Sequence, residues 1–306
     1  MQIRSLVMLS SLAACGGGGD SPAPDAPAAK DIGFNKPTKS LKANMEVSED
    51  SWMEIGAADM ACLGTPSTDL ATTVEVALST VVRDFQSDNL VPGAMITAFK
   101  DQDIGVPFDT QTADGNAAVT ITIPVGTKRF GYKMVDSTSL DTLLLNQKVD
   151  PDMATQTEGS IRSVSKSTAQ TLPALIGISR TQGTGVLAGA LRDCQDRETS
   201  NFIATVTTIP ARSYDEANAN RVNGADTYYF SSSVGLPVRH TQKSAGSEDG
   251  LFMIVEIDPA PTAFVQVWGY RDDAALAADN LELIAELQTQ SVADTVITGS
   301  YEPLRQ

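Results

Sequence analysis

His240 is the only histidine of this chain, and this limits the possible catalytic chemistry most. A serine hydrolase would need a histidine between a hydroxyl and a carboxylate, and Ser244 and Asp249 are close to His240 in the sequence. No serine lies in the glycine pattern of a nucleophile elbow. We therefore interpret His240 as a surface histidine in a loop before a hairpin, and hydrolysis is the function we favour least.

Paired carboxylates suggest a second kind of chemistry, the binding of a cation. The pattern Asp101-x-Asp103-x-Gly105 places oxygen ligands at alternate positions of a loop, as calcium requires. It lacks the third acid and the distal glutamate of an EF-hand loop. Solvated loop charge is the interpretation we favour, and calcium at Asp101 and Asp103 is the alternative. Zinc is disfavoured by the shortage of ligands, and no other cofactor is expected.

Aromatic side chains on the surface would indicate a sugar-binding site, because aromatic faces stack on sugar rings. The same residues also fill sandwich cores. Strand alternation places Tyr228 and Phe230 on one face and Tyr229 on the other, so at least one should point inward. Core packing is favoured. If the chain binds a glycan or protein ligand, Tyr228, Tyr229 and the insertion over residues 214–223 are the candidate surface, since loops on a rigid scaffold often carry function.

The N-terminus predicts export and lipidation. Arg4 and the short apolar run over residues 6–12 are typical of a secretory signal, and the run is too short to span a bilayer. The segment Leu12-Ala13-Ala14-Cys15 resembles the bacterial lipobox, which implies that residues 1–14 are a lipoprotein signal peptide and that Cys15 is acylated. The lipid on Cys15 would then hold the protein on a membrane.

The residues after the cysteine predict where that membrane is and how the protein stands on it. Gly16 is not the aspartate that commonly retains lipoproteins at the inner membrane, which favours lipid anchoring at the outer membrane and leaves its face undecided. Glycine, proline, alanine and serine dominate the following residues, so 15–50 are predicted to be a flexible tether.

The remaining cysteines, Cys62 and Cys194, are an even number in an exported chain, which suggests one disulfide between them. Cys62 precedes the first strand of one half of the chain and Cys194 follows the first strand of the other. A bridge would therefore fasten the two halves together. Two separately buried thiols are the alternative, because sequence does not give the distance between the residues.

Composition sets the class of protein and of partner. The 306 residues are 42% hydrophobic and suffice for two domains. The net charge of -16 argues against nucleic acid and against attraction to anionic lipid, because like charges repel.

Two segments, residues 74–132 and 186–268, show the same order of features, which indicates two copies of one domain. Both have an apolar strand, a polar turn, a second strand, an Asp-Gly turn and a strand ending in proline. In the first Asp-Gly turn, Gly115 is expected to supply a positive φ. Short strands separated by turns indicate antiparallel sandwiches. The matching positions are Arg83-Asp84 with Arg192-Asp193, Asp114-Gly115 with Asp249-Gly250, and Pro124 with Pro259.

The first copy resembles the carboxypeptidase regulatory-like domain in its Asp-rich turn, Val91-Pro92-Gly93-Ala94 and Thr112-Ala113-Asp114-Gly115. This resemblance implies a prealbumin-like (transthyretin-like, Ig-like) β-sandwich in which these turns hold the fold and carry no chemistry. The second copy departs from the pattern at Ser200-Asn201-Phe202 and in an insertion over residues 212–232. The whole arrangement resembles bacterial surface lipoproteins.

The predicted fold is all-β, with two tandem antiparallel prealbumin-like sandwiches over residues 51–150 and 184–306. A connector over residues 151–183 joins them and contains a short helix over 163–178. The predicted function is a non-catalytic, membrane-anchored binding or adhesion module for a protein or glycan. A structural spacer or accessory subunit of an outer-membrane complex is the alternative.

Overall fold

The computed structural model describes residues 34–48, 51–84, 87–157, 159–169, 180–230, 237–241 and 243–306. The predicted signal peptide, Cys15 and the tether up to residue 33 lie outside these ranges. Strands dominate, which confirms the all-β prediction. Apart from one helical turn at residues 166–169, the described helices are α2 (Tyr214–Ala219) and α3 (Asp273–Ala277). None of the described helices is long and apolar enough to cross a membrane.

The first sandwich is built from short strands whose apolar residues alternate with polar ones. Val76, Leu78, Thr80 and Val82 of β3 are buried, and the residues between them are half-buried. The strands are β3 (Val76–Asp84), β4 (Met95–Lys100), β5 (Pro107–Thr112), β6 (Ala118–Ile123), β7 (Arg129–Val135), β8 (Ser139–Lys148), β9 (Thr155–Thr157) and β10 (Ile161–Ser165).

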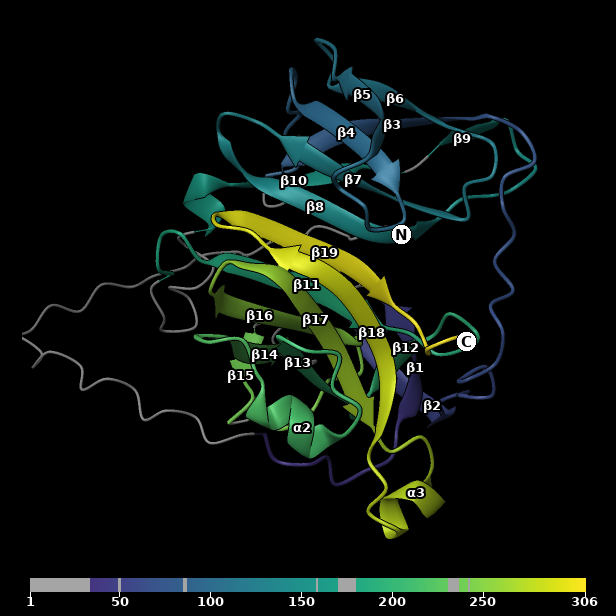
Figure 1. The fold of residues 1–306 in the computed structure, drawn as a ribbon, viewed down its shortest axis with the longest axis vertical. Coiled ribbons are helices and arrows are strands. Elements are labelled where there is room, and N and C mark those ends of the chain that lie inside the picture. The colour runs from purple at the N-terminus through teal and green to yellow at the C-terminus, as the bar shows by residue number, and fades with distance from the viewer. Residues whose placement is uncertain are drawn as a thin grey trace, which may run out of the picture.

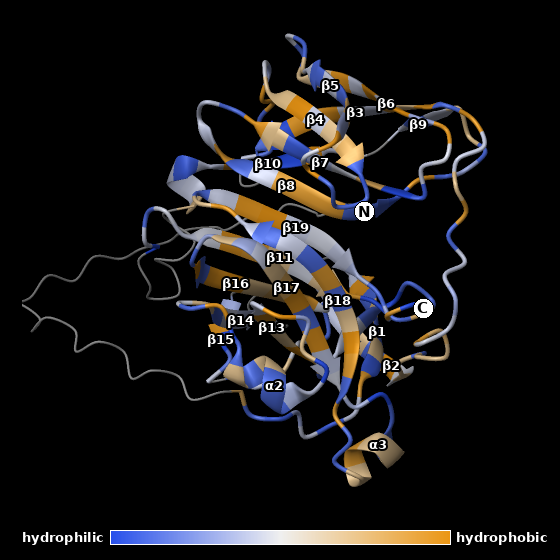
Figure 2. Cartoon of the chain, in the orientation of Figure 1, coloured by the Kyte–Doolittle hydropathy of each residue, from blue (hydrophilic) through white to orange (hydrophobic). Residues whose placement is uncertain are grey.

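The second sandwich repeats this plan. Figure 2 shows apolar and polar residues alternating along its long strands β17 and β18. The strands are β11 (Gly185–Leu191), β12 (Glu198–Ser200), β13 (Ile203–Thr207), β14 (Asp226–Phe230), β15 (Pro237–Arg239), β16 (Leu251–Ile257), β17 (Ala260–Gly269), β18 (Glu282–Ser291) and β19 (Thr295–Tyr301).

The pairing pattern supports the internal repeat. In the first sandwich β3 pairs antiparallel with β6, β4 with β7, and β7 with β8, while β10 runs parallel to β3. In the second, β11 pairs antiparallel with β16, β13 with β17, and β17 with β18, while β19 runs parallel to β11. These four pairings recur in both halves, as expected of two copies of one domain, although β8 also pairs with β10 whereas β18 does not pair with β19.

The two sandwiches share one sheet (Figure 1), which the sequence did not predict. One edge of β8 pairs first with β10, at Ser139 and Leu140, and then with β19 in parallel over residues 141–145. The result is a continuous 13-stranded sheet that runs from β15 in the second sandwich to β6 in the first. Two separate sandwiches would each end in free edge strands. Here an edge strand of one sandwich pairs with an edge strand of the other.

The folded region begins earlier than predicted. Phe34 is 8% exposed and Leu41 is fully buried, and β1 (Lys42–Ser48) pairs with β12 of the second sandwich. The predicted tether of residues 15–50 is therefore wrong for residues 34–48. β2 (Ser51–Ala57) pairs with β1, so Trp52 lies on a hairpin joined to the second sandwich rather than on the first sandwich.

The connector over residues 151–183 also differs from the prediction. Its first part is strand: β9 and β10 both run parallel to β3. Residues 163–165, expected at the start of the helix, belong to β10 (Ile161–Ser165), in which Ile161 and Ser163 are buried against the sheet in alternation. Helical residues follow at 166–169, and the rest of the predicted helix lies outside the described residues.

Candidate functional site

The two tyrosines predicted as a ligand-binding surface lie in the core, so that prediction is wrong. Tyr228 is 1% exposed and its hydroxyl donates to Asp226, and Tyr229 is fully buried on the opposite face of β14. The Tyr229 hydroxyl accepts a hydrogen bond from the backbone N–H of Ala204 at 3.0 Å. Burial raises the pKa of both phenols above the usual range. Both faces of β14 are covered by other elements, whereas alternation of apolar and polar residues predicts a strand with only one buried face.

The insertion over residues 214–223 is packed against the N-terminal segment. Ser213 caps α2 by accepting from the N–H of Glu216, and the Tyr214 hydroxyl donates to the carbonyl oxygen of Phe34. Arg221 lies over the ring of Phe34, with its guanidinium carbon 5.0 Å from the ring centroid. The insertion therefore holds Phe34, the first residue described, against the second sandwich.

His240 is buried, contrary to the predicted surface position. It is 4% exposed, and its ring centroid lies 4.3 Å from that of Phe34. Its Nε2 is 3.5 Å from Asp226, a carboxylate that also accepts from Arg239. Phe34, which we had assigned to the flexible tether, covers this histidine. The predicted exposure of His240 was wrong because the segment that contains Phe34 is folded onto it.

Asp101 and Asp103 lie on an exposed turn after β4. Asp101 has a positive φ of 52°, and the Asp103 carboxylate accepts from the N–H of Gly105 within the same turn. Over the described ranges, no three His, Cys, Asp or Glu side chains come together in a way that could hold a metal ion. Calcium at this loop stays a prediction that rests on the sequence alone.

The predicted disulfide is confirmed. Cys62 and Cys194 are bonded across 132 residues of chain, with their Cα atoms 5.8 Å apart. Asp193 stands beside Cys194, and its carboxylate accepts from the backbone N–H of Asp59 and from Arg197. The bridge thus joins the loop after β2 to the loop after β11, just where the chain leaves the second sandwich for the first.

Ionic contacts reinforce the same junction. Arg129 of β7 donates to Asp69 at 2.6 Å and to Glu302, beyond β19, at 2.9 Å. Lys148 also pairs with Glu302. Although partial burial of Arg129 opposes its charge, the hydrogen bonds that it donates to its two carboxylate partners raise its pKa. Burial of Asp69 acts to raise the pKa of this carboxyl, but the hydrogen bond from Arg129 outweighs that effect and the pKa is lowered. A polar cavity of about 50 Å³ lies beside the disulfide and has room for a few water molecules.

The most exposed apolar surface formed by neighbouring strands is the hairpin of β1 and β2, hereafter the N-terminal hairpin. Only Lys42, Ala43 and Asn44 of β1 pair with β12, so the remainder projects from the second sandwich (Figure 1). Its large exposed apolar side chains, with exposures between 41% and 53%, are Met45, Val47, Met53 and Ile55. Sequence reasoning missed this surface because residues 42–48 were assigned to the tether. The apolar and polar alternation on either side of the turn was the available signal.

No family model and no curated protein sequence matches this chain. The similar solved structures include the shaft pilin SpaA of Lactobacillus rhamnosus GG, which is 9% identical with a TM-score of 0.23 over 76% of this chain and 98% of the pilin. Another is a streptococcal ancillary pilin, 12% identical with a TM-score of 0.20 over 76% of this chain and 63% of that protein. Similarity at these TM-scores does not indicate the function of this chain.

Proposed function

We propose that this protein is a lipid-anchored, non-catalytic binding or adhesion module of the bacterial outer membrane. The proposal rests on the packing of residues 34–41 against the second sandwich, which is itself joined to the first sandwich by strand pairing. Tyr214 and Arg221 hold Phe34, and the Leu41 N–H donates to the carbonyl oxygen of Tyr270. If Cys15 is anchored in a membrane, the folded part of the chain begins at these contacts of Phe34 and Leu41.

The joining of the two sandwiches supports the same proposal. β1 attaches residues 34–41 to the second sandwich, and the β8–β19 pairing joins the second sandwich to the first. The disulfide ties the loop after β2 to the loop after β11. Hydrogen-bonded strand pairs and a covalent bridge would resist a pull on the tether.

A structural spacer is the second candidate function, and the continuous sheet favours it. A spacer needs stiffness and no ligand, and the fused β8–β19 edge supplies stiffness. The two candidates differ in whether the surface binds anything, since only the first requires a ligand.

The test uses the full chain in a Gram-negative host, with Cys15→Ser as the matched variant. Incorporation of labelled palmitate into the wild type and not into Cys15→Ser, with outer-membrane fractionation, is expected for the anchored protein. Saturable adhesion of cells carrying the wild type to immobilised proteins or glycans, absent with Cys15→Ser, would support the binding module. Acylation without adhesion would favour the spacer, and absence of acylation would overturn both.

A further inference from the structure

The N-terminal hairpin presents two chemically different faces. Met45 and Met53 are directly opposite each other in the strand register, so they share one face. Glu46 is opposite Trp52 on the other face, and Glu54 follows two residues after Trp52 on that face. One face is therefore apolar, and the other carries a tryptophan between two carboxylates.

The outer edge of β2 has no partner strand within the part of the chain that the structure describes. β2 pairs with β1 alone, and the three-stranded sheet ends there in the order β12-β1-β2. Every second residue of this edge directs its backbone N–H and carbonyl away from β1, and such an edge accepts an added strand. Six of the seven β2 residues are exposed, with Trp52 half-buried, so no described element shields the edge.

The charges of the hairpin indicate what kind of strand fits. Glu46 and Glu54 make no ion pair with any described residue, and both lie on the Trp52 face. A strand added beside β2 places alternate side chains on the two faces. Apolar side chains would then lie beside Met53, and basic ones beside Glu54, where opposite charges across neighbouring strands are stabilising.

A second copy of this chain fits the edge less well. Two β2 strands paired antiparallel would bring the glutamates of both copies onto common faces, and like charges there are destabilising. The net charge of -16 on each chain adds long-range repulsion. An anionic bilayer would be repelled by the same carboxylates.

We propose that the free edge of β2 binds, by strand addition, an extended segment of a partner protein in which apolar and basic residues alternate. Main-chain hydrogen bonds to β2 supply affinity, while Met53 and Glu54 select the side chains. This inference rests on the proposed binding function and names the class of partner.

The experiment uses the full chain carrying Cys15→Ser, which removes the lipid, and a labelled peptide of about nine residues that alternates valine and lysine, long enough to cover β2. Saturable binding by fluorescence anisotropy is expected, together with slowed amide hydrogen exchange over Ser51–Ala57. Trp52 emission should change as well, since Trp268 is buried away from the edge. Glu54→Lys should weaken binding roughly tenfold by replacing attraction with repulsion.

Two controls separate strand addition from general attraction to an acidic protein. The same charge change at the exposed Glu75 of the first sandwich, Glu75→Lys, should leave the affinity unchanged. A peptide with glutamate in place of lysine should not bind. Binding that Glu54→Lys and Glu75→Lys weaken equally, or binding without protection of β2, would overturn the proposal.

Two further measurements test whether a second copy of this chain or a bilayer occupies the β2 edge instead. Dimerisation in sedimentation velocity that Met53→Lys abolishes would assign the edge to a second copy, and pelleting with phosphatidylcholine vesicles that Met53→Lys abolishes would assign it to a bilayer. Either result overturns the peptide partner. The test is independent of the anchoring experiment, because absent acylation in cells overturns the anchored module while lost peptide binding overturns only the hairpin site.

Discussion

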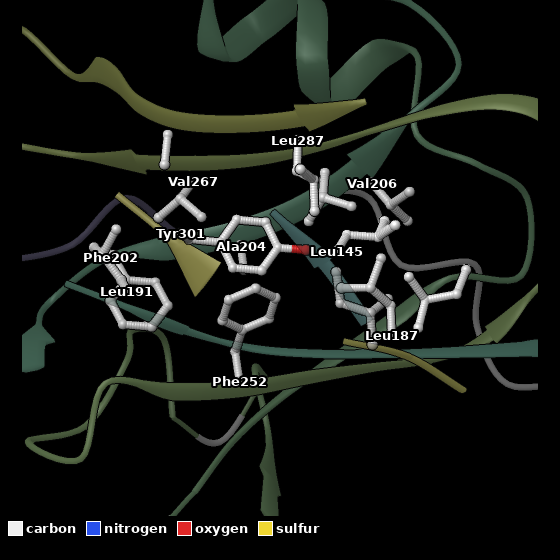
Figure 3. Close-up of a cluster of buried hydrophobic side chains, with 14 of the residues drawn as sticks. Leu145, Leu187, Leu191, Phe202, Ala204, Val206, Phe252, Val267, Leu287 and Tyr301 are labelled. Carbon is white, nitrogen blue, oxygen red and sulfur yellow. The ribbon is translucent and has the colours of Figure 1, made fainter. Parts of the chain in front are cut away.

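Two buried tyrosine hydroxyls in the same core have opposite surroundings. The Tyr229 hydroxyl accepts from the N–H of Ala204, whereas the Tyr301 hydroxyl has no hydrogen-bond partner among the described residues. Figure 3 shows the Tyr301 oxygen among apolar side chains, with the Phe252 ring alongside at a centroid distance of 5.0 Å. A buried polar group without a partner costs free energy, so these two residues should respond oppositely to loss of the hydroxyl.

Tyr301→Phe is expected to raise the free energy of unfolding by about 1 kcal/mol, because it removes an unsatisfied group and keeps the ring. Tyr229→Phe, the matched control, should lower it by about 1 to 3 kcal/mol, because it leaves the Ala204 N–H buried and unpaired. Urea denaturation of the two variants measures both values. A destabilised Tyr301→Phe would mean that its hydroxyl has a partner after all.

Asp249 makes stability depend on pH. Burial raises its pKa from 3.8 to about 7, with Glu248 raising it further and Lys243 opposing. The folded state therefore binds more protons than the unfolded state between these values. The free energy of unfolding should then fall as pH rises from about 4 to above 7, by about 1.4 kcal/mol per unit of pKa shift.

Asp249→Asn is expected to flatten this pH dependence and to raise stability at pH 8, since an amide does not ionise. Its side-chain oxygen can still accept from the Leu251 N–H, which Asp249 does in the wild type. Thermal unfolding at pH 5 and pH 8 measures the change. An unaltered slope in the variant would assign the dependence to other groups.

At the scale of the element, β11 depends on glycine in the middle of a strand. A Cβ on Gly189 would lie 2.2 Å from Cε2 of Tyr301, so the ring occupies the space that a side chain would need. Gly189→Ala should destabilise the protein by about 2 kcal/mol through overpacking. Gly115→Ala, where a Cβ would meet nothing within 4 Å, should be nearly neutral. Equal effects in denaturation would show that Tyr301 yields easily.

Individual strands were largely predictable, because one buried face imposes a period of two. Val119, Ile121 and Ile123 of β6 are buried as their alternation with threonine indicates. Turn geometry was less predictable. Gly115 was expected to supply a positive φ, but Ala117 adopts it, at 59°, because Asp114 accepts from the N–H groups of Asn116 and Ala118 and extends the turn. Side-chain hydrogen bonds of this kind leave no periodic signal.

The candidate site was less predictable still. Tyr228 and Tyr229 were offered as a candidate binding surface although core packing was favoured, and their burial depends on elements far away in sequence. Phe34 and β1 were read as tether because the preceding residues are rich in glycine and proline, although Leu41, Ala43 and Asn44 are buried. Short apolar segments reveal their role only when a distant strand, here β12, covers them.

For the whole molecule, the core of the second sandwich extends into the first, which also has a buried cluster of its own. The largest buried cluster combines Phe99, Leu143 and Leu145 from the first sandwich with Leu187 and Leu287 from the second. Neither sandwich can bury this cluster alone. Calorimetry is therefore expected to give one unfolding transition, with calorimetric and van't Hoff enthalpies equal. Two separated transitions would show independent domains.

The disulfide should stabilise this single unit. For a loop that closes 132 residues, the chain-entropy account gives about 5 kcal/mol. The variant with Cys62→Ser and Cys194→Ser is expected to unfold at a markedly lower temperature and still in one transition, because the β8–β19 pairing remains. An unchanged midpoint, or a midpoint that reducing agent shifts in this variant, would contradict the assignment.

The β8–β19 pairing also sets the order in which the protein can be made. Asp141 of β8 pairs with Thr295 of β19, which lies 154 residues later in the chain, so β8 leaves the ribosome well before its partner strand. Until then β8 exposes an unpaired edge beside Leu143 and Leu145, and β11 lacks its parallel neighbour. The shared sheet can form only after β19 has been made. A chain truncated before β19 would expose both edges and be a substrate for chaperones and proteases.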